Sequence, residues 1–165
     1  MFTKPNIQLN KVTNITPAFL KEHNIKCLIL DVDNTLCINK GKNMIVGADR
    51  WLKKMKMEGI KLVILSNAKP KRMGPIAKKL CLEMVALGLK PLPFGYFRAA
   101  KKMGVRLKNC AIVGDQLLTD ILGGNLAGVK TVLVAPTLLE TSRGFKIKRA
   151  IERKLLKWHG LKCNF

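Results

Sequence analysis

The fold is decided by the stretch KCLILDVDNT, residues 26–35, in which an expected buried strand runs directly into two carboxylates. The run 26–30 is short, apolar and branched, which is typical of a strand covered on both faces. Asp31 and Asp33 leave the strand on the same side, where two negative charges repel each other unless a cation or proton intervenes. Either Asp33 and Asn34 form the corner of a polar turn, or the two aspartates are a metal-assisted nucleophile and its general acid.

Four more apolar runs of strand length follow along the chain, and helical patterns separate them. Strands alternating with helices predict a three-layer, Rossmann-like α/β fold, with a central parallel sheet of about five strands and helices on both faces. We expect residues 1–165 to form one domain of this kind. The further strands are expected at 60–65, 84–87, 110–113 and 131–134, and the helices at 49–58, 71–82, 94–104, 117–127 and 145–158.

The composition is strongly basic yet apolar enough for a folded core. The 165 residues include 31 Lys and Arg against 10 Asp and Glu, a formal charge of +21, and mean hydropathy is +0.09. These values exclude a disordered chain, and no apolar run reaches the ~18–20 residues of a membrane span. Without a secretory signal pattern, and with five cysteines that form no CxxC pair, the protein is expected in the cytoplasm with reduced thiols. The charge indicates either an anionic partner or a lysine-rich genome.

Polar side chains follow the other expected strands as well. Ser66 and Asn67 come after the second strand, Lys90 after the third, and Asp115 and Asp120 after the fourth. Taken singly, Ser66 is explained as a helix N-cap, Lys90 as a surface lysine and Asp120 as a helix-surface carboxylate. Because the carboxyl ends of parallel strands converge, we expect all of them in one pocket. Several acids with one lysine and one hydroxyl suit Mg²⁺ bound beside a phosphoryl group.

These segments resemble the four motifs of the haloacid dehalogenase (HAD) superfamily of phosphatases, in the same order and at the same strand ends. The match narrows to the YqeG subfamily, which is related to the mitochondrial phosphatidylglycerophosphatases. The string from Gly114 to Asn125 is the most specific part of this likeness, and the tail around Arg149 and Glu152 is also similar. Motif two departs slightly, since Ala68-Lys69-Pro70 stands where relatives often carry another polar residue.

The resemblance implies a role for each motif residue. Asp31 is expected to attack phosphorus and form an aspartyl-phosphate, while Asp33 acts first as general acid and then as general base. The magnesium ligands would include the backbone carbonyl of Asp33. The residues implied are Asp31, Asp33, Ser66 and Lys90 for catalysis, Thr35, Asn67 and Lys69 for the substrate and its support, and Asp31, Asp33, Asp115 and Asp120 for Mg²⁺.

Two features bear on the substrate. The intervals 37–59 and 68–89 are near the length of an ordinary crossover, so no cap domain is expected and the open site suits a phosphate carried on something large. The expected helix 145–158 combines a basic face with an apolar stripe, which either packs on the sheet or contacts an anionic membrane. That stripe consists of Ile147, Ile151, Leu155 and Trp158.

Three functions remain open at this point. The first is a peripheral, Mg²⁺-dependent phosphatase on the inner membrane face that converts phosphatidylglycerophosphate to phosphatidylglycerol. The second is a phosphatase of the same type acting on a nucleotide, a nucleic-acid end or a phosphoprotein. The third is an RNA- or ribosome-associated binding protein, which the charge permits but the few aromatic residues and the intact catalytic set disfavour.

Overall fold

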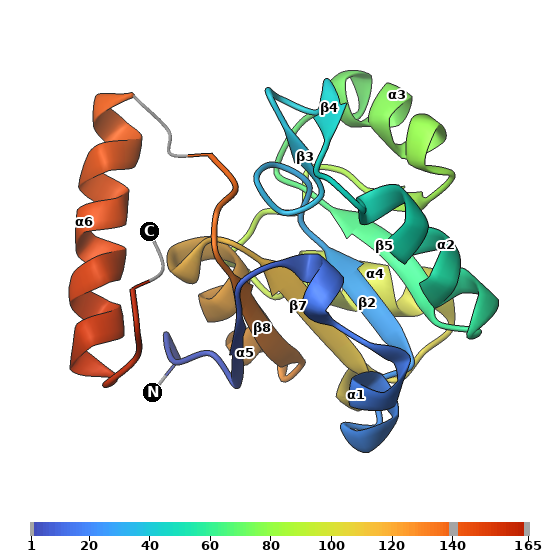
Figure 1. Ribbon diagram of the computed structural model, residues 1–165, viewed down its shortest axis with the longest axis horizontal. Coiled ribbons are helices and arrows are strands. Elements are labelled where there is room, and N and C mark those ends of the chain that lie inside the picture. Colours follow the sequence, from blue (N-terminus) through green and yellow to red (C-terminus); the bar gives the residue numbers. More distant parts are fainter. Residues whose placement is uncertain (1, 139–141, 164–165) are drawn as a thin grey trace.

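The computed structural model describes residues 2–138 and 142–163 and has three layers, with a six-stranded sheet between helices (Figure 1). All neighbouring strands of this sheet pair in parallel, in the order β1-β8-β7-β2-β5-β6. The parallel α/β class expected from the sequence is therefore confirmed. The strands are β1 (Ile7–Leu9), β2 (Cys27–Leu30), β5 (Lys61–Leu65), β6 (Glu83–Val85), β7 (Cys110–Gly114) and β8 (Lys130–Val134).

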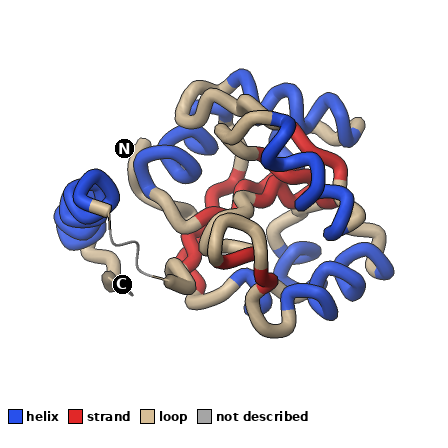
Figure 2. The backbone as a smooth tube through the Cα atoms, turned by 90° about the horizontal axis from the view of Figure 1, so that it is seen from above, coloured by secondary structure: helices blue, strands red, loops and turns tan. Residues whose placement is uncertain are grey.

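Helices cover both faces of the sheet, as the view in Figure 2 shows. The side chains of β2 alternate between these faces: Leu28 and Leu30 join the core beneath α2 and α3, whereas Cys27 and Ile29 join the core beneath α4. Because all four are fully buried, no polar position interrupts the run, which explains its continuous apolar pattern. The helices are α1 (Pro17–Glu22), α2 (Ala48–Met57), α3 (Pro70–Leu80), α4 (Phe94–Met103), α5 (Leu122–Ala127) and α6 (Arg143–Trp158).

Several short elements were not expected from the sequence. The sixth strand is β1, an edge strand of three half-buried residues, which is too short to produce a recognisable apolar run. The helix α1 was likewise missed, and the interval after β2 contains a small hairpin of β3 (Cys37–Ile38) and β4 (Asn43–Met44) before α2. The helix expected over 117–127 begins as a π-helical turn, Leu117–Ile121, and continues as α5.

The carboxyl ends of the central strands carry no cap domain. Between β2 and β5 the chain holds only the β3–β4 hairpin and α2, and between β5 and β6 it holds only α3. Both intervals lie wholly within the described residues. The end of the sheet that carries the motif residues is therefore left open.

Of the two alternatives for the apolar stripe of the last helix, packing on the sheet is wrong. In α6 the side chains of Ile147, Ile151 and Trp158 are 64%, 46% and 66% exposed, and only Leu155 of the stripe is partly buried. The helix lies beside the β1–β8 edge and the π-helical turn (Figure 1). There Arg149 donates a hydrogen bond to Asp115 O, and Glu152 accepts one from Leu118 N. Among the described residues, no helix is both long and apolar enough to cross a bilayer. The buried residues of α6 are Arg149, Glu152 and Leu156.

Candidate active site

Three carboxylates meet at the carboxyl end of the sheet. Asp31 follows β2 and Asp115 follows β7, and these strands are parallel neighbours with Leu30 opposite Val113. Asp120 reaches the same place from the π-helical turn, so that one carboxylate oxygen of each lies within 4.8 Å of the others. Gly114 allows this approach, because a Cβ atom there would overlap the carboxylate of Asp120. The structure thus brings together three of the four aspartates that the sequence predicts for one pocket.

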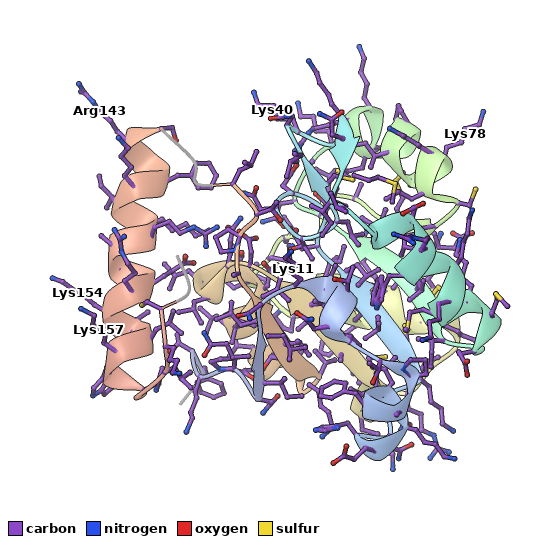
Figure 3. All side chains as sticks on the ribbon, in the orientation of Figure 1. Lys11, Lys40, Lys78, Arg143, Lys154 and Lys157 are labelled. Atoms are coloured by element: carbon purple, nitrogen blue, oxygen red, sulfur yellow. The ribbon has the colours of Figure 1, made fainter. Side chains whose placement is uncertain are left out.

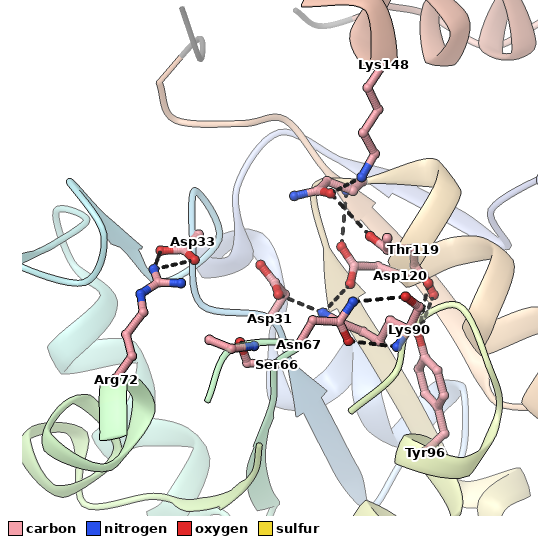
Figure 4. A network of polar contacts seen from close by, with 12 residues as sticks. Asp31, Asp33, Ser66, Asn67, Arg72, Lys90, Tyr96, Thr119, Asp120 and Lys148 are labelled. Carbon is pink, nitrogen blue, oxygen red and sulfur yellow. Dashed lines mark hydrogen bonds and ion pairs between the residues drawn. The ribbon is translucent and has the colours of Figure 1, made fainter. Parts of the chain in front are cut away.

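Lys90 connects two of these acids. Its Nζ donates hydrogen bonds to Asp31 Oδ1 at 2.7 Å and to Asp120 Oδ1 at 2.6 Å (Figure 4). Burial alone would lower the pKa of Lys90, but the charges of Asp120 and Asp31 outweigh burial and raise this pKa above its usual value. Lys90 is therefore charged at neutral pH and offsets part of the negative charge of the cluster.

The backbone of Lys90 is held by Asn67. The amide of Asn67 donates to Lys90 O at 2.9 Å, and Asn67 Oδ1 accepts a hydrogen bond from Lys90 N at 2.7 Å. These two bonds occupy the amide group on both its donor and acceptor sides. In this structure Asn67 therefore supports the lysine loop, consistent with the supporting role implied for it.

The remaining oxygens of the cluster fit a divalent cation. Asp31 Oδ2 and Asp115 Oδ1 are buried and have no hydrogen-bond partner among the described residues. Burial raises the pKa of Asp31 to about 6 and raises the pKa of Asp115 well above its usual value, although Lys90 and Arg149 act in the opposite direction. Unpartnered buried carboxylate oxygens are costly, and hard oxygen donors are what Mg²⁺ prefers. Asp31, Asp115 and Asp120 are thus the side chains that could hold the ion.

The inner side of Asp115 is held by α6. Arg149 Nη2 donates to Asp115 Oδ2, and Arg149 Nη1 donates to Asp115 O at 2.7 Å and to Glu152 Oε2 at 2.9 Å. Glu152 Oε1 in turn accepts the backbone N–H of Leu118 at 3.3 Å. Sequence reasoning noted these two residues only as part of the tail and gave them no place at the site. The available sequence signal was the three-residue spacing of Arg149 and Glu152, which places them on one face of the helix. Apolar periodicity instead points to the face that carries Ile147 and Ile151.

Asp33 does not join the buried carboxylates. Arg72 Nη2, from the first turn of α3, contacts both carboxylate oxygens of Asp33 at 2.7 Å (Figure 4). The side chain of Arg72 is 40% exposed and that of Asp33 is 34% exposed, so this ion pair lies at the rim. Asp33 also lines a cavity of about 750 Å³ together with Lys40, Gln116 and Phe145. The expected general acid therefore lies between the carboxylate cluster and an open pocket.

The other expected site residues occupy different positions. Ser66 is buried at the end of β5, and its Oγ accepts a hydrogen bond from Ala68 N at 3.1 Å. Thr35 is buried, and its Oγ1 has no hydrogen-bond partner within the described part of the chain. Lys69 is exposed at the N-terminus of α3. Tyr96, which was not expected at the site, donates to the backbone carbonyl of Asp120 at 3.1 Å and so braces the turn that carries this acid.

Comparison with known families gives two partial matches and one nearly complete one. The HAD-hydrolase-like family matches residues 89–137, and the mitochondrial PGP phosphatase family matches residues 1–79. A Bacillus subtilis (strain 168) protein named "Probable phosphatase YqeG" is 36% identical over 157 residues. This alignment covers 94% of the present chain and 90% of the Bacillus protein, so the likeness includes the site and α6 together.

Solved structures share the fold at low sequence identity. An uncharacterized Listeria monocytogenes protein superposes with a TM-score of 0.58 at 16% identity, covering 83% of this chain and all of that one. The cobalt-bound deoxy-D-mannose-octulosonate 8-phosphate phosphatase of Haemophilus influenzae gives a TM-score of 0.52 at 19% identity, covering 85% of this chain and 92% of the neighbour. At these identities the comparison concerns the arrangement of the sheet and helices only.

Proposed function

Since the chain belongs to the YqeG family of HAD phosphatases, we propose that it is a Mg²⁺-dependent phosphomonoesterase that acts through an aspartyl-phosphate. Its proposed substrate is phosphatidylglycerophosphate, and the product is phosphatidylglycerol. The observation that carries the catalytic part is the buried cluster of Asp31, Asp115 and Asp120 beside a charged lysine, in which two oxygens have no partner among the residues that the structure describes. Such a cluster is costly in a fold and suits a bound cation with a phosphoryl group.

Two displacements complete the proposed reaction. A carboxylate oxygen of Asp31 attacks phosphorus, the bond from phosphorus to the leaving oxygen breaks, and Asp33 gives its proton to that oxygen. In the second step Asp33 takes a proton from water, the water oxygen attacks phosphorus, and the bond to Asp31 breaks. Lys90, already fixed by Asn67, is positioned to donate to a phosphoryl oxygen in both steps. Bound Mg²⁺ would offset the negative charge that builds up between the phosphoryl group and the aspartates.

A lipid substrate is supported by the open site and by apolar side chains on the loop that carries Lys90 and on the start of α4. Within the described part of the chain, no cap domain encloses a small metabolite. Five large apolar side chains within residues 87–97 are between 42% and 57% exposed, three on the loop and two on the start of α4. An exposed apolar group of this kind, beside the lysine proposed to bind phosphate, suits an amphiphile. The side chains are Leu87, Leu89, Leu92, Phe94 and Phe97.

The outer face of α6 is the proposed contact with an anionic membrane. Ile147, Ile151 and Trp158 fall on one side of the helix, opposite the buried Arg149 and Leu156. Basic side chains flank this stripe, and the labelled Arg143, Lys154 and Lys157 project away from the body of the protein (Figure 3). The one acid of the helix, Glu152, is buried and ion-paired. An apolar stripe with an all-basic border complements an anionic bilayer, at about 1 kcal/mol for each base near the surface.

The substrate proposal is tested by phosphate release with Mg²⁺ from phosphatidylglycerophosphate in mixed micelles, beside nucleotides, a phosphorylated RNA end and a phosphopeptide. We expect the lipid to give the highest kcat/KM, and Asp31→Asn to abolish release and the acid-stable phosphoenzyme. Equal or better turnover of another class would reject the lipid. RNA binding that persists in Asp31→Asn, without turnover of any phosphate ester, would instead support the binding-protein alternative.

The membrane contact is tested by cosedimentation with vesicles. Wild-type protein is expected to bind vesicles containing 30 mol% phosphatidylglycerol, roughly, and to leave pure phosphatidylcholine vesicles unbound, with binding weakened by salt. Ile151→Ser with Trp158→Ser should reduce binding several-fold. Arg106→Ser, an exposed base on the opposite end of the fold from the strand ends, provides a control for charge alone. Binding that is unaffected by the double variant would reject α6 as the contact.

A further inference from the structure

Arg72 is a cation placed beside the expected general acid. Only one of its guanidinium nitrogens, Nη2, is engaged, and it contacts both oxygens of Asp33. Nη1 and Nε have no acceptor among the described residues, and the side chain is 40% exposed. An arginine fork with free donors is suited to bind an oxyanion in two-point contact. The guanidinium can therefore bind an anion in addition to its contact with Asp33.

The cavity next to Asp33 has the lining that a charged, amphiphilic leaving group needs. It contains a second cation, Lys40, on the turn of the β3–β4 hairpin, and the apolar side chains Ile38 and Phe145. Among the described residues of the lining, Asp33 is the one acid and Arg72 and Lys40 are the two cations. The general acid therefore borders this cavity, whereas the buried acids and Lys90 lie outside its lining.

The role of Asp33 as general acid indicates which part of the substrate this cavity holds. Asp33 protonates the leaving oxygen, so the alcohol attached to that oxygen must lie on the Asp33 side of phosphorus. The cation in contact with Asp33 is Arg72, and Lys40 lines the same cavity. An anionic group on the alcohol would pair with Arg72 and compete for the guanidinium with Asp33.

We infer that Arg72, with Lys40, forms a subsite for a second anionic group carried on the leaving alcohol. This subsite would make the enzyme selective for phosphomonoesters with two anions over those with one. The inference rests on the proposed phosphatase function and adds a specificity determinant to it. The second anion can belong to a lipid head group or to a soluble bisphosphate, since both offer the same oxyanion to the guanidinium.

The test compares matched substrates with one and two anions. The soluble pair is glycerol 1-phosphate and glycerol 1,3-bisphosphate, and the lipid pair is phosphatidic acid and phosphatidylglycerophosphate in mixed micelles. We expect Arg72→Ala to reduce the ratio of kcat/KM, two anions over one, by about tenfold to a hundredfold, because a hydrogen bond to a charged group is lost. Arg72→Lys should retain part of the ratio, since it keeps the charge without the fork. Lys71→Ala, an exposed base next in the chain, should leave the ratio unchanged.

Binding to the Asp31→Asn protein gives a readout that does not need turnover. Calorimetric titration should show tighter binding of glycerol 1,3-bisphosphate than of glycerol 1-phosphate, and Arg72→Ala should remove this difference. A drop in kcat/KM that is equal for both members of a pair would mean that Arg72 only positions Asp33, and would overturn the inference. Selectivity confined to the lipid pair would show that the subsite recognises the anion only as part of a lipid head group. Selectivity in both pairs would show that the subsite recognises the anion whether or not a lipid carries it. If the wild type hydrolyses none of these esters, the proposed function fails, while the titration still decides the subsite.

Discussion

Replacing Arg149 by Met should destabilise the protein more than any other single change on α6. Met keeps much of the aliphatic volume but removes the guanidinium, which donates to Asp115 through a backbone and a side-chain bond and to Glu152. Both carboxylate side chains are 0% exposed, so neither gains water in exchange. Removing one partner of a buried ion pair costs about 3–5 kcal/mol, against a total of about 5–15 kcal/mol for a domain.

Urea unfolding in EDTA at pH 7.5 measures this loss, with Arg153→Met as the matched control. Arg153 is exposed on the same helix, so its replacement should shift the midpoint little. The loss for Arg149→Met should also shrink at pH 5, because unpaired buried carboxylates have raised pKa values and become neutral as the pH falls. A loss equal to that of the control, or one independent of pH, would show that Asp115 and Glu152 do not depend on Arg149 for their charge compensation.

Three further outcomes are expected. Burial raises the pKa of Asp31 from 3.8 to about 6, so the protonation of Asp31 stabilises the fold below pH 4, roughly, and this stabilisation is lost as the pH rises through 6. The increase in Tm caused by MgCl₂ should therefore be larger at pH 7.5 than at pH 5, which scanning fluorimetry can measure. Asp31→Asn should raise the Tm of the metal-free protein in calorimetry while abolishing phosphate release, since it removes a buried charge. Gly114→Ala should push Asp120 aside, cost about 1–3 kcal/mol in urea unfolding and reduce the Tm increase caused by MgCl₂.

The strand ends were predictable because they depend on local pattern and a general rule. Apolar runs of four or five residues located β2, β5 and β7, and the convergence of parallel strands then placed Asp31 beside Asp115. The edge strand β1 was not predictable, because three half-buried residues leave no run to detect. The structure also adds Asn67 as the residue that holds the backbone of Lys90, a contact between loops that sequence spacing cannot resolve.

The two arginines of the site could not be assigned from the sequence for a different reason. Arg72 lies three positions after Lys69 on α3, and only the three-dimensional path of the helix decides which of the bases there meets Asp33. Arg149 contacts Asp115 across 34 residues of sequence separation. Apolar periodicity favours burial of Ile147 and Ile151. In the structure these two side chains are exposed, and the helix instead buries Arg149, which makes ionic contacts with the rest of the protein.

The charged side chains of the site do not balance one another. Half of the ten acids belong to the network of Asp31, Asp33, Asp115, Asp120 and Glu152, and three cations, Lys90, Arg72 and Arg149, pair with them. With all groups in their ordinary ionised forms, five carboxylates and three cations leave a formal charge of −2, which one divalent cation would neutralise. Burial is the main cause of the raised pKa values of Asp31 and Asp115, and the charges of the neighbouring aspartates raise these pKa values further. Because half of the acids are withdrawn into the site, the rest of the surface is even more basic than the total of +21 indicates. A positive surface attracts an anionic substrate at long range, and the proposed metal would offset the negative charge only where the phosphoryl group binds.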